Sequence, residues 1–506
     1  MFEVAEVGRS LSKEEYKQAE PEVHYRLLTL QQKLRASSKA LIVIVAGVEG
    51  AGKGEVVNKL NRWFDTRDVQ THAFWDETDE ERERPEFWRY WRTFPARGSI
   101  SVMFGSWYGK PITDRAFDKI DDGDFESELQ RIEDLERTLT RDGNIIVKLW
   151  FHLPREEQRK QAELDSKNFG FKKPGLMGEY SKSYEQLTRV SGRAIRLTDT
   201  GFAPWNIIEA TDSRYRDISV GKALISSLER ALKNNTSVSE STQEPEDSVL
   251  DKILESSKSN ITILDNLDLD QSLTDEEYDA QLSEAQQRLY KLAWSMHNQK
   301  KNAVLVFEGW DAAGKGSSIR RLAAAMDARL YRVIPVGAPT DEELLHHYLW
   351  RFWRQIPRAG FMTIYDRSWY GRVLVERIEK LADQREWLRS YQEINNFEEN
   401  LTSHSIAVIK FWIHISNNEQ LNRFKAREND VLKKHKITKA DWRNREKWDQ
   451  YKLAVNDMVA HTSTAYAPWN LIAGNDKKFA RVQILNTVCE SLEKILNPQD
   501  PPSEVS

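Results

Sequence analysis

The sequence predicts an α/β protein in which one domain occurs twice, each copy having a parallel β-sheet covered by helices. Three observations lead to this prediction. Long segments recur at a spacing of 262 residues, the interval from Gly47 to Gly309. Within each copy, apolar runs without a polar face alternate with helical segments, as buried parallel strands do. A chain of 506 residues is also too long for one hydrophobic core.

The internal duplication is visible in several pairs of matching segments. These pairs are LSKEEY (11–16) with LTDEEY (273–278), VAGVEGAGKG (45–54) with FEGWDAAGKG (307–316), FWRYWRTFPARG (87–98) with LWRFWRQIPRAG (349–360), and VKLWFHL (147–153) with IKFWIHI (409–415). A last pair, GFAPWNII (201–208) and AYAPWNLI (465–472), has slipped by two further residues. Such a long period indicates a tandem domain duplication, not a short-period solenoid.

The elements of each copy are predicted in the same order. An amphipathic helix precedes a first strand at 40–47 or 302–309, which is followed by a glycine-rich loop and a helix. A second apolar strand ends at 104 or 365, and a third covers 144–153 or 406–415.

Composition between the copies sets the predicted domain limits. The polar, acidic stretch NNTSVSESTQEPEDSV has too few large apolar residues to fold and is typical of a linker. We therefore expect a first domain at 1–232, a linker at 233–256, a second domain at 257–498 and a flexible tail at 499–506.

Bulk composition excludes several classes of protein. The chain is 40% hydrophobic and 30% charged with a net charge of −5, so it has no overall attraction to nucleic acid or to an anionic membrane. The single cysteine, Cys489, rules out an intramolecular disulfide framework and a cysteine-based zinc site. No secretory signal is evident at the start, and no apolar run reaches the length of about 20 residues that spans a bilayer. We expect a cytoplasmic enzyme or scaffold without nucleic-acid or membrane partners.

The second copy contains a phosphate-binding loop, GWDAAGKG, with the spacing G-x-x-x-x-G-K between a strand and a helix. Its glycines, Gly309, Gly314 and Gly316, allow backbone N–H groups to surround phosphate oxygens. Lys315 would place an ammonium on the phosphoryl group that is transferred. Gly316 stands where a serine or threonine usually binds the metal.

Two acidic residues of the second copy are candidates for holding Mg²⁺ in place of that hydroxyl. Asp311 lies inside the loop, and Asp366 ends the second strand, where an acid can hold Mg²⁺ directly or through water. Arg367 beside it can neutralise phosphate charge in the transition state.

With these motifs the chain resembles the polyphosphate kinase 2 family, and more closely its two-domain members. The resemblance rests on GWDAAGKG, WRFWRQIPRAG, YDRSWYGRVLVERI (365–378), EQLNRFKAR (419–427) and STAYAPWNLI (463–472). It implies a P-loop kinase core and Mg²⁺-dependent transfer of the terminal phosphoryl group of inorganic polyphosphate to a nucleotide. For the two-domain members, it implies that AMP is converted to ADP.

The resemblance also implies roles for individual residues. Asp311 and Asp366 would handle metal and phosphate, Lys315 belongs to the loop, and Arg367 is the basic partner of the second acid. Arg423 and Arg427 would be arginines of a lid, and their spacing of four places them on one helix face. Three further arginines near the site are candidates for lining a groove for a polyanionic chain: Arg351, Arg354 and Arg358.

The first copy departs from this pattern. Lys53 matches Lys315, but Phe104 replaces Asp366 and Gly105 replaces Arg367. Glu49 stands for Asp311, while Gln161 and Asp165 stand for the two lid arginines. Phenylalanine cannot bind a metal, so we expect a degenerate domain that packs, positions or regulates. Weak polyphosphate binding through Lys53 remains an alternative.

Two other functions are compatible with parts of the sequence. An ATP-dependent nucleoside monophosphate kinase would also show G-x-x-x-x-G-K and an Asp-Arg pair, although Gly316 and the arginine-rich segment argue against it. A non-catalytic polyanion-binding scaffold would suit the first copy better than the second. Chain-length preference, nucleobase selectivity and oligomeric state are not determined by the sequence, and a homo-oligomer is compatible with it.

Overall fold

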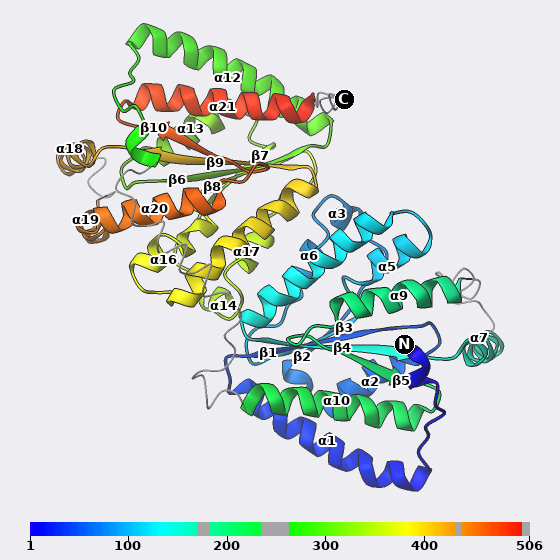
Figure 1. Cartoon of the computed structure of the whole chain (residues 1–506). Helices are drawn as coiled ribbons and strands as arrows, with labels where there is room; N and C mark the ends of the chain where they lie inside the picture. Colours follow the sequence, from blue (N-terminus) through cyan, green and yellow to red (C-terminus); the bar gives the residue numbers. More distant parts are fainter. Residues whose placement is uncertain (170–182, 234–262, 431–436, 498–506) are drawn as a thin grey trace. The chain divides into compact units, whose positions relative to one another are not determined.

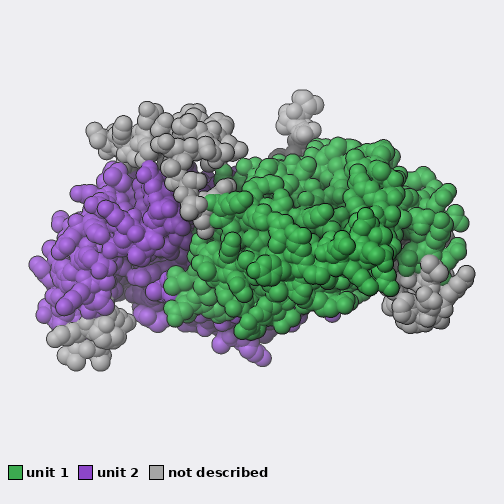
Figure 2. Space-filling view, turned by 90° about the horizontal axis from the view of Figure 1, so that it is seen from below, with its two compact units in different colours: residues 1–78, 89–240, 340–350 green, residues 79–88, 241–339, 351–506 purple. Residues whose placement is uncertain are grey.

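The computed structural model describes residues 1–169, 183–233, 263–430 and 437–497. The chain divides into two compact units, which Figure 2 distinguishes by colour. Unit 1 contains residues 1–78, 89–240 and 340–350, and unit 2 contains residues 79–88, 241–339 and 351–506. Each unit therefore includes a short segment of the other repeat. The domain limits expected from the sequence stay a prediction, and the expected linker and tail lie outside the described residues except for Lys233.

Unit 1 is built on a sheet of five parallel strands in the order β2-β3-β1-β4-β5. The strands are β1 (Ala40–Gly47), β2 (Val69–Ala73), β3 (Ile100–Phe104), β4 (Asn144–His152) and β5 (Trp205–Glu209). Helices α1, α2 and α10 cover one face, and α5, α6 and α9 cover the other (Figure 1). The larger helices are α1 (Lys13–Arg35), α2 (Lys53–Trp63), α5 (Gly109–Ala116), α6 (Asp122–Arg141), α7 (Arg155–Phe169), α9 (Tyr184–Thr198) and α10 (Ser213–Lys233).

Unit 2 repeats this architecture with the strand order β7-β8-β6-β9-β10. Its strands are β6 (Asn302–Gly309), β7 (Tyr331–Pro335), β8 (Met362–Asp366), β9 (Ile406–His414) and β10 (Trp469–Ala473). Helices α12, α13 and α21 lie on one face, and α17 and α20 lie on the other (Figure 1). Its larger helices are α12 (Asp275–Asn298), α13 (Lys315–Ala324), α17 (Gln384–Ser403), α18 (Asn417–Glu428), α19 (Lys439–Glu446), α20 (Trp448–Thr462) and α21 (Lys477–Leu496).

The remaining helices within the described residues are short. Five consist of a single turn of α-helix: α3 (Asp79–Arg82), α4 (Trp88–Trp91), α14 (Asp341–Leu344), α15 (Trp350–Trp353) and α16 (Val375–Ile378). Four are 3-10 turns: Phe2–Ala5, Thr66–Asp68, Ile263–Asn266 and Trp369–Arg372. Among the described helices, none is both long enough and apolar enough to cross a bilayer.

The sequence explains why these elements form where they do. The repeated LSKEEY and LTDEEY segments start α1 and α12 with reciprocal caps, Ser12 with Glu15 and Thr274 with Glu277. The central strand β6 is buried along its length up to Gly309, as expected for a strand with sheet on both sides and helices on both faces. The expected α/β class, with tandem parallel sheets covered by helices, is confirmed.

Candidate active site

The glycine-rich loop joins β6 to α13 at the carboxyl edge of the unit 2 sheet. Gly309 has a φ of +150°, and a Cβ on it would lie 2.6 Å from the carbonyl oxygen of Ile413 on the neighbouring strand. No larger residue fits there without moving the sheet. Gly314 caps the start of α13 with a φ of +120°. The loop thus has the conformation that the sequence motif predicts.

Lys315 is folded back on this loop. Its Nζ donates hydrogen bonds to the carbonyl oxygens of Gly309 at 2.5 Å and Trp310 at 3.2 Å. Burial lowers the pKa of Lys315, and the carboxylates of Asp311 and Asp366 act in the opposite direction. An ammonium in this position is available to a phosphoryl group that displaces the two carbonyl contacts.

The Asp-Arg pair at the end of β8 lies beside the loop because β8 pairs with β6, with Phe307 opposite Asp366. Asp366 Oδ2 is 3.8 Å from the position that a Cβ on Gly316 would take. Arg367 has a φ of +67°, a left-handed conformation that costs energy in a residue with a side chain. Its guanidinium donates to Asp311 Oδ1 at 3.3 Å. The structure therefore brings together the residues that the sequence assigns to the reaction.

Glu308 supports the turn that contains Arg367, and sequence reasoning missed it. Its buried carboxylate accepts a hydrogen bond from Ser368 Oγ at 2.8 Å, and Ser368 Oγ accepts one from the backbone N–H of Tyr370 at 3.3 Å. Burial raises the pKa of Glu308, while Lys315 acts to lower it. The first copy has Ala46 at this position, so comparing the repeats outside the motif could have revealed it.

Aromatic and amide contacts hold Asp311. Asn444 of α19 donates to Asp311 Oδ2 at 2.9 Å. The preceding Trp310 stacks on Trp448 with ring centroids 3.7 Å apart, and its indole N–H donates to His414 Nδ1 at 3.1 Å. Burial lowers the pKa of His414 to about 4, so the imidazole is neutral and can accept this bond. The loop acid is thus positioned from both α19 and β9.

The two arginines of α18 differ in their surroundings. Arg423 is buried, and its guanidinium donates to the carbonyl oxygens of Ala312 and Ala313 in the loop and of Gly474 and Asn475 after β10, at 2.6–3.0 Å. Its Nε donates to Glu419 at 2.5 Å. All of its N–H groups therefore have protein acceptors, which suits holding the loop better than holding phosphate. Arg427 is half-buried and lines the cavity described next.

A cavity of about 670 Å³ opens over the phosphate loop of unit 2. Most of the residues that the sequence assigns to the site line it, namely Asp311, Gly314, Lys315, Gly316, Asp366, Arg367, Arg423 and Arg427. Three further cations that the sequence analysis missed also line it, namely Arg320, Lys477 and Arg481. These three residues lie on helices that come next to the loop only in the folded chain. In the sequence, they could have been found only by comparing the two copies, because the first copy has Asn58, Ser213 and Asp217 at the matching positions.

Arg351, Arg354 and Arg358 are not among the residues that line this cavity. Arg351 donates to the carbonyl oxygen of Gly337 at 3.2 Å, and Arg358 forms an ion pair with Glu83 at 2.7 Å. Arg354 is exposed. A polyanion that reaches these arginines must therefore extend beyond the cavity.

The corresponding loop of unit 1 has different neighbours. Lys53 donates to the carbonyl oxygens of Gly47 at 2.8 Å and Val48 at 2.9 Å, as Lys315 does in unit 2. The ring of Phe104, however, lies 4.0 Å from the position of a Cβ on Gly54, where unit 2 presents a carboxylate. The guanidinium of Arg216 packs directly against the loop and is paired with Glu55 at 2.8 Å and Asp217 at 3.0 Å.

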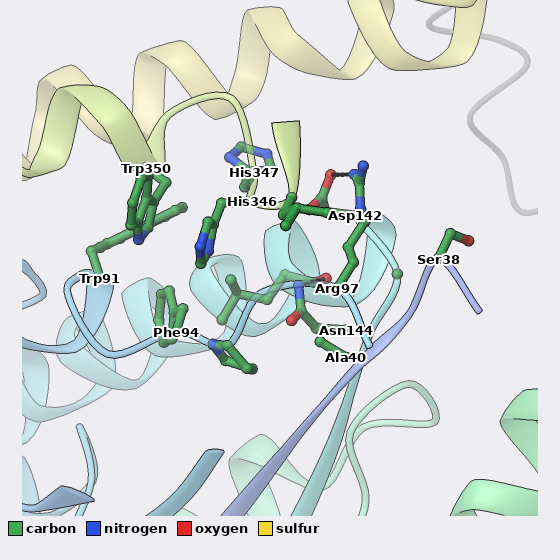
Figure 3. A pocket seen from close by; sticks show the side chains of 14 residues that line it. Ser38, Ala40, Trp91, Phe94, Arg97, Asp142, Asn144, His346, His347 and Trp350 are labelled. Atoms are coloured by element: carbon green, nitrogen blue, oxygen red, sulfur yellow. Dashed lines mark hydrogen bonds and ion pairs between the residues drawn. The ribbon is translucent and has the colours of Figure 1, made fainter. Parts of the chain in front are cut away.

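Unit 1 also contains a pocket of about 10 Å³, lined by Trp91, His346, His347 and Trp350 among others (Figure 3). His346 stacks on Trp350 with centroids 4.0 Å apart, and Arg97 is paired with Asp142 at 3.3 Å. This volume holds about one water molecule, so the pocket is too small for a nucleotide or a phosphate chain.

Comparison with known proteins identifies the family. The family model of polyphosphate kinase 2 matches residues 10–236 and 272–500. The chain belongs to the polyphosphate kinase 2 family. It is similar to a polyphosphate:AMP phosphotransferase of Pseudomonas syringae pv. tomato, with 42% identity over 498 residues that cover 98% of each protein. A polyphosphate:AMP phosphotransferase of Pseudomonas aeruginosa is 43% identical over 497 residues, covering 97% of this chain and 99% of that protein.

A solved member of the polyphosphate kinase 2 family has the same architecture over its whole length. The crystal structure of a Pseudomonas aeruginosa protein assigned to polyphosphate kinase 2 superimposes with a TM-score of 0.87 at 40% identity, covering 99% of this chain and 100% of that one. The tandem arrangement of two α/β domains is therefore shared with that protein.

Proposed function

We propose that this chain transfers the terminal phosphoryl group of inorganic polyphosphate to AMP, giving ADP, and that unit 2 carries the reaction. One observation carries the proposal: a single cavity joins the phosphate loop to a cluster of cations that suits a polyanion. These are Lys315, Arg320, Arg367, Arg427, Lys477 and Arg481. The names of the two Pseudomonas relatives support the same donor and acceptor.

The residues of unit 2 suit each part of this reaction. A phosphate oxygen of AMP bonds to the terminal phosphorus of the donor, and the bond from that phosphorus to the next bridging oxygen breaks, so polyphosphate leaves one unit shorter. Lys315 and Arg367 approach the phosphoryl group and neutralise the charge on its oxygens. Arg427 closes over the phosphates from α18, and Arg423 keeps the loop in place.

Mg²⁺ is part of the proposal, and the donor set fits it. Mg²⁺ is usually held by one or two carboxylates together with substrate phosphates and water, and Asp311 and Asp366 line the same cavity as Lys315. Among the described residues, no group of three or more His, Cys, Asp or Glu side chains could hold a metal ion without the substrate. When bound, Mg²⁺ would neutralise charge on the phosphate oxygens.

Unit 1 is proposed to be structural or regulatory. Phe104 occupies the position of the metal-binding acid, and Arg216 with its two carboxylate partners fills the space against the loop. A cytoplasmic location and a homo-oligomer stay predictions.

A donor and acceptor screen tests the proposal. Purified protein is incubated with AMP, Mg²⁺ and either polyphosphate or ATP, and the nucleotides are separated. We expect ADP formation with polyphosphate and much less with ATP. Equal rates with ATP would favour a nucleoside monophosphate kinase, and binding of polyphosphate without any ADP would favour a scaffold.

The metal assignment has its own test. Asp366→Asn removes one ligand charge from the site with little change in shape, so we expect a loss of about 10²-fold in turnover. The half-saturating Mg²⁺ concentration should also rise. An unchanged Mg²⁺ dependence in a folded, slow variant would contradict the role of this carboxylate.

A further inference from the structure

Asp311 is held at both its side chain and its backbone by two neighbouring helices. Its carboxylate Oδ2 accepts a hydrogen bond from the side-chain amide of Asn444 on α19 at 2.9 Å. Its backbone carbonyl oxygen accepts one from Gln420 on α18 at 3.2 Å. Gln420 is buried, and its side-chain oxygen accepts a hydrogen bond from Arg445 of α19 at 3.0 Å. The two helices and the loop acid therefore form one connected network.

The segment that carries Asn444 is itself anchored by charged groups. Arg445 donates to the backbone carbonyl oxygen of Asn417 at 2.7 Å, and Lys447 forms an ion pair with Glu379 at 2.8 Å. Hydrogen bonds that involve a charged group are stronger than those between neutral groups. The amide of Asn444 therefore has a fixed position beside the loop.

Asn444 can affect the site only through Asp311, because Asp311 lines the cavity and Asn444 does not. The other side-chain donor to this carboxylate within the described residues is Arg367, which bonds to Oδ1 at 3.3 Å. In the proposed reaction Arg367 turns to the phosphoryl group, and the amide then remains the side-chain donor to the carboxylate. An oxygen of an ionised carboxylate has two lone pairs, so Oδ2 can keep this bond while it binds Mg²⁺. Partners of this kind fix the orientation of a metal ligand.

The loop acid of unit 1 has a different partner. Glu49 stands at the position of Asp311, and its carboxylate accepts a hydrogen bond from the loop lysine, Lys53, at 3.3 Å. In the described part of unit 2, Lys315 bonds to two loop carbonyls and to no carboxylate. An acid that pairs with the loop lysine offsets the positive charge that a phosphoryl group needs. The contacts of Asp311 in unit 2 leave both groups available.

We propose that Asn444 is a positioning residue that keeps the Asp311 carboxylate turned toward the metal site and away from Lys315. The inference rests on the proposed function and deepens it, because an amide outside the cavity then sets part of the affinity for Mg²⁺. Without this amide, the Asp311 carboxylate pairs with Lys315, as Glu49 pairs with Lys53 in unit 1.

The variant Asn444→Ala tests the inference through the Mg²⁺ dependence of ADP formation. The half-saturating Mg²⁺ concentration should rise about 10-fold or more, the usual scale when the hydrogen-bond partner of a metal ligand is lost. At saturating Mg²⁺, kcat and the KM values for AMP and polyphosphate should return to within about threefold of those of the unmodified protein. A role in packing alone would leave the Mg²⁺ dependence unchanged.

A crystal structure of metal-free Asn444→Ala gives a readout that does not depend on turnover. We expect the Asp311 carboxylate to lie within hydrogen-bond distance of Lys315 Nζ. Asn400→Ala is the matched control, because Asn400 also donates its side-chain amide, to the carbonyl oxygen of Asn396 at 2.7 Å, but does not line the cavity. Its Mg²⁺ dependence should equal that of the unmodified protein, and circular dichroism checks that both variants are folded.

Two outcomes would overturn the inference. They are an unchanged half-saturating Mg²⁺ concentration in folded Asn444→Ala, or an Asp311 carboxylate that keeps its place in that variant. The proposed function fails in a different way, if the unmodified protein makes no ADP from polyphosphate and AMP. Binding of Mn²⁺ to the full chain, measured by electron paramagnetic resonance, then still tests the role of Asn444, since the alanine variant should bind Mn²⁺ about 10-fold more weakly.

Discussion

The two units share a buried network of charges but differ in almost every charge of the phosphate site. In unit 1, Lys148 is paired with Glu136 at 2.7 Å, and in unit 2 Lys410 is paired with Glu398 at 2.6 Å, with all four side chains fully buried. In each network the Glu also accepts hydrogen bonds from the tyrosine and tryptophan of the Ser-Trp-Tyr-Gly segment. The segment is common to both copies because it completes the core.

The charged residues of the candidate site, by contrast, are not shared between the two copies. Asp366 and Arg367 become Phe104 and Gly105 in unit 1, and the other cavity cations except Lys315 are replaced by neutral or acidic residues. Glu308, which holds the turn after the strained Arg367, becomes Ala46. The duplicated core therefore shows what the fold needs, and the difference between the copies marks the charges that belong to the proposed phosphate site.

The largest expected effect is on stability and is equal in the two units. Glu398→Ala or Glu136→Ala leaves a buried lysine without its partner, which costs about 3–5 kcal/mol. Hydrogen exchange should show lost protection of the mutated unit, with the same size of effect in each. The exposed Glu399→Ala on the same helix serves as a control. A much smaller effect in unit 1 would mean that its network is not structural.

The second effect is on activity and is confined to unit 2. Lys315→Ala removes the ammonium that we propose neutralises the transferred phosphoryl group, so turnover should fall by about 10²–10³-fold. Lys53→Ala should leave most of the activity, although both lysines have the same contacts to loop carbonyls. ADP formation measures both variants. If the two lysines proved equally important in folded protein, unit 1 would take part in the chemistry.

Much of this comparison could be predicted from the sequence because it depends on local patterns. The expected strands at 40–47 and 302–309 coincide with β1 and β6, and the second strand ends within one residue of each expected position. The loop, Asp311, Asp366 and Arg367 converge because parallel strands place their carboxyl ends at one edge.

The rest depends on contacts that no local pattern contains. Arg423 was expected to face phosphate because it shares a helix face with Arg427, but the carbonyl groups that surround it come from two loops distant in the sequence. Lys477 and Arg481 belong to no motif and reach the cavity only through the sheet order. The segments 79–88 and 340–350 are each grouped with the unit of the other repeat. The sequence does not predict this exchange, because the two repeats match each other through these segments.

A smaller loss of activity is expected when Arg423 is changed, and this change tests whether Arg423 holds the phosphate loop in place. Arg423→Lys keeps the charge but cannot reach four carbonyl groups at once, so kcat should fall by about 10-fold with little change in the KM for polyphosphate. Arg427→Ala should instead raise that KM. Hydrogen exchange should show faster exchange of loop amides in Arg423→Lys only. Full activity of Arg423→Lys would show that a point charge is sufficient there.

We expect no gain in ADP formation when the missing Asp-Arg pair is restored in unit 1. Phe104→Asp with Gly105→Arg is placed in the Lys315→Ala background, and ADP formation is measured. Gly105 has a φ of +82°, and a Cβ there would lie 3.0 Å from the carbonyl oxygen of Phe74, so the new arginine would be strained. In unit 2, Glu308 stabilises the strained turn by accepting a hydrogen bond from Ser368. The matching residue of unit 1, Ala46, has no side-chain acceptor for such a bond.

Even a well-placed Asp-Arg pair in unit 1 would lack the other cations, because asparagine, glutamine, serine and acidic residues stand at their positions. Arg216 would also still fill the space beside the loop. We therefore expect no recovery. Clear ADP formation by this variant would mean that the acid and its arginine are sufficient for transfer, and that the cluster of cations around the unit 2 cavity only improves affinity. Adding Arg216→Ala to the same protein separates the two causes, the missing cations and the arginine beside the loop. If ADP forms only after this addition, Arg216 is what prevents activity in unit 1.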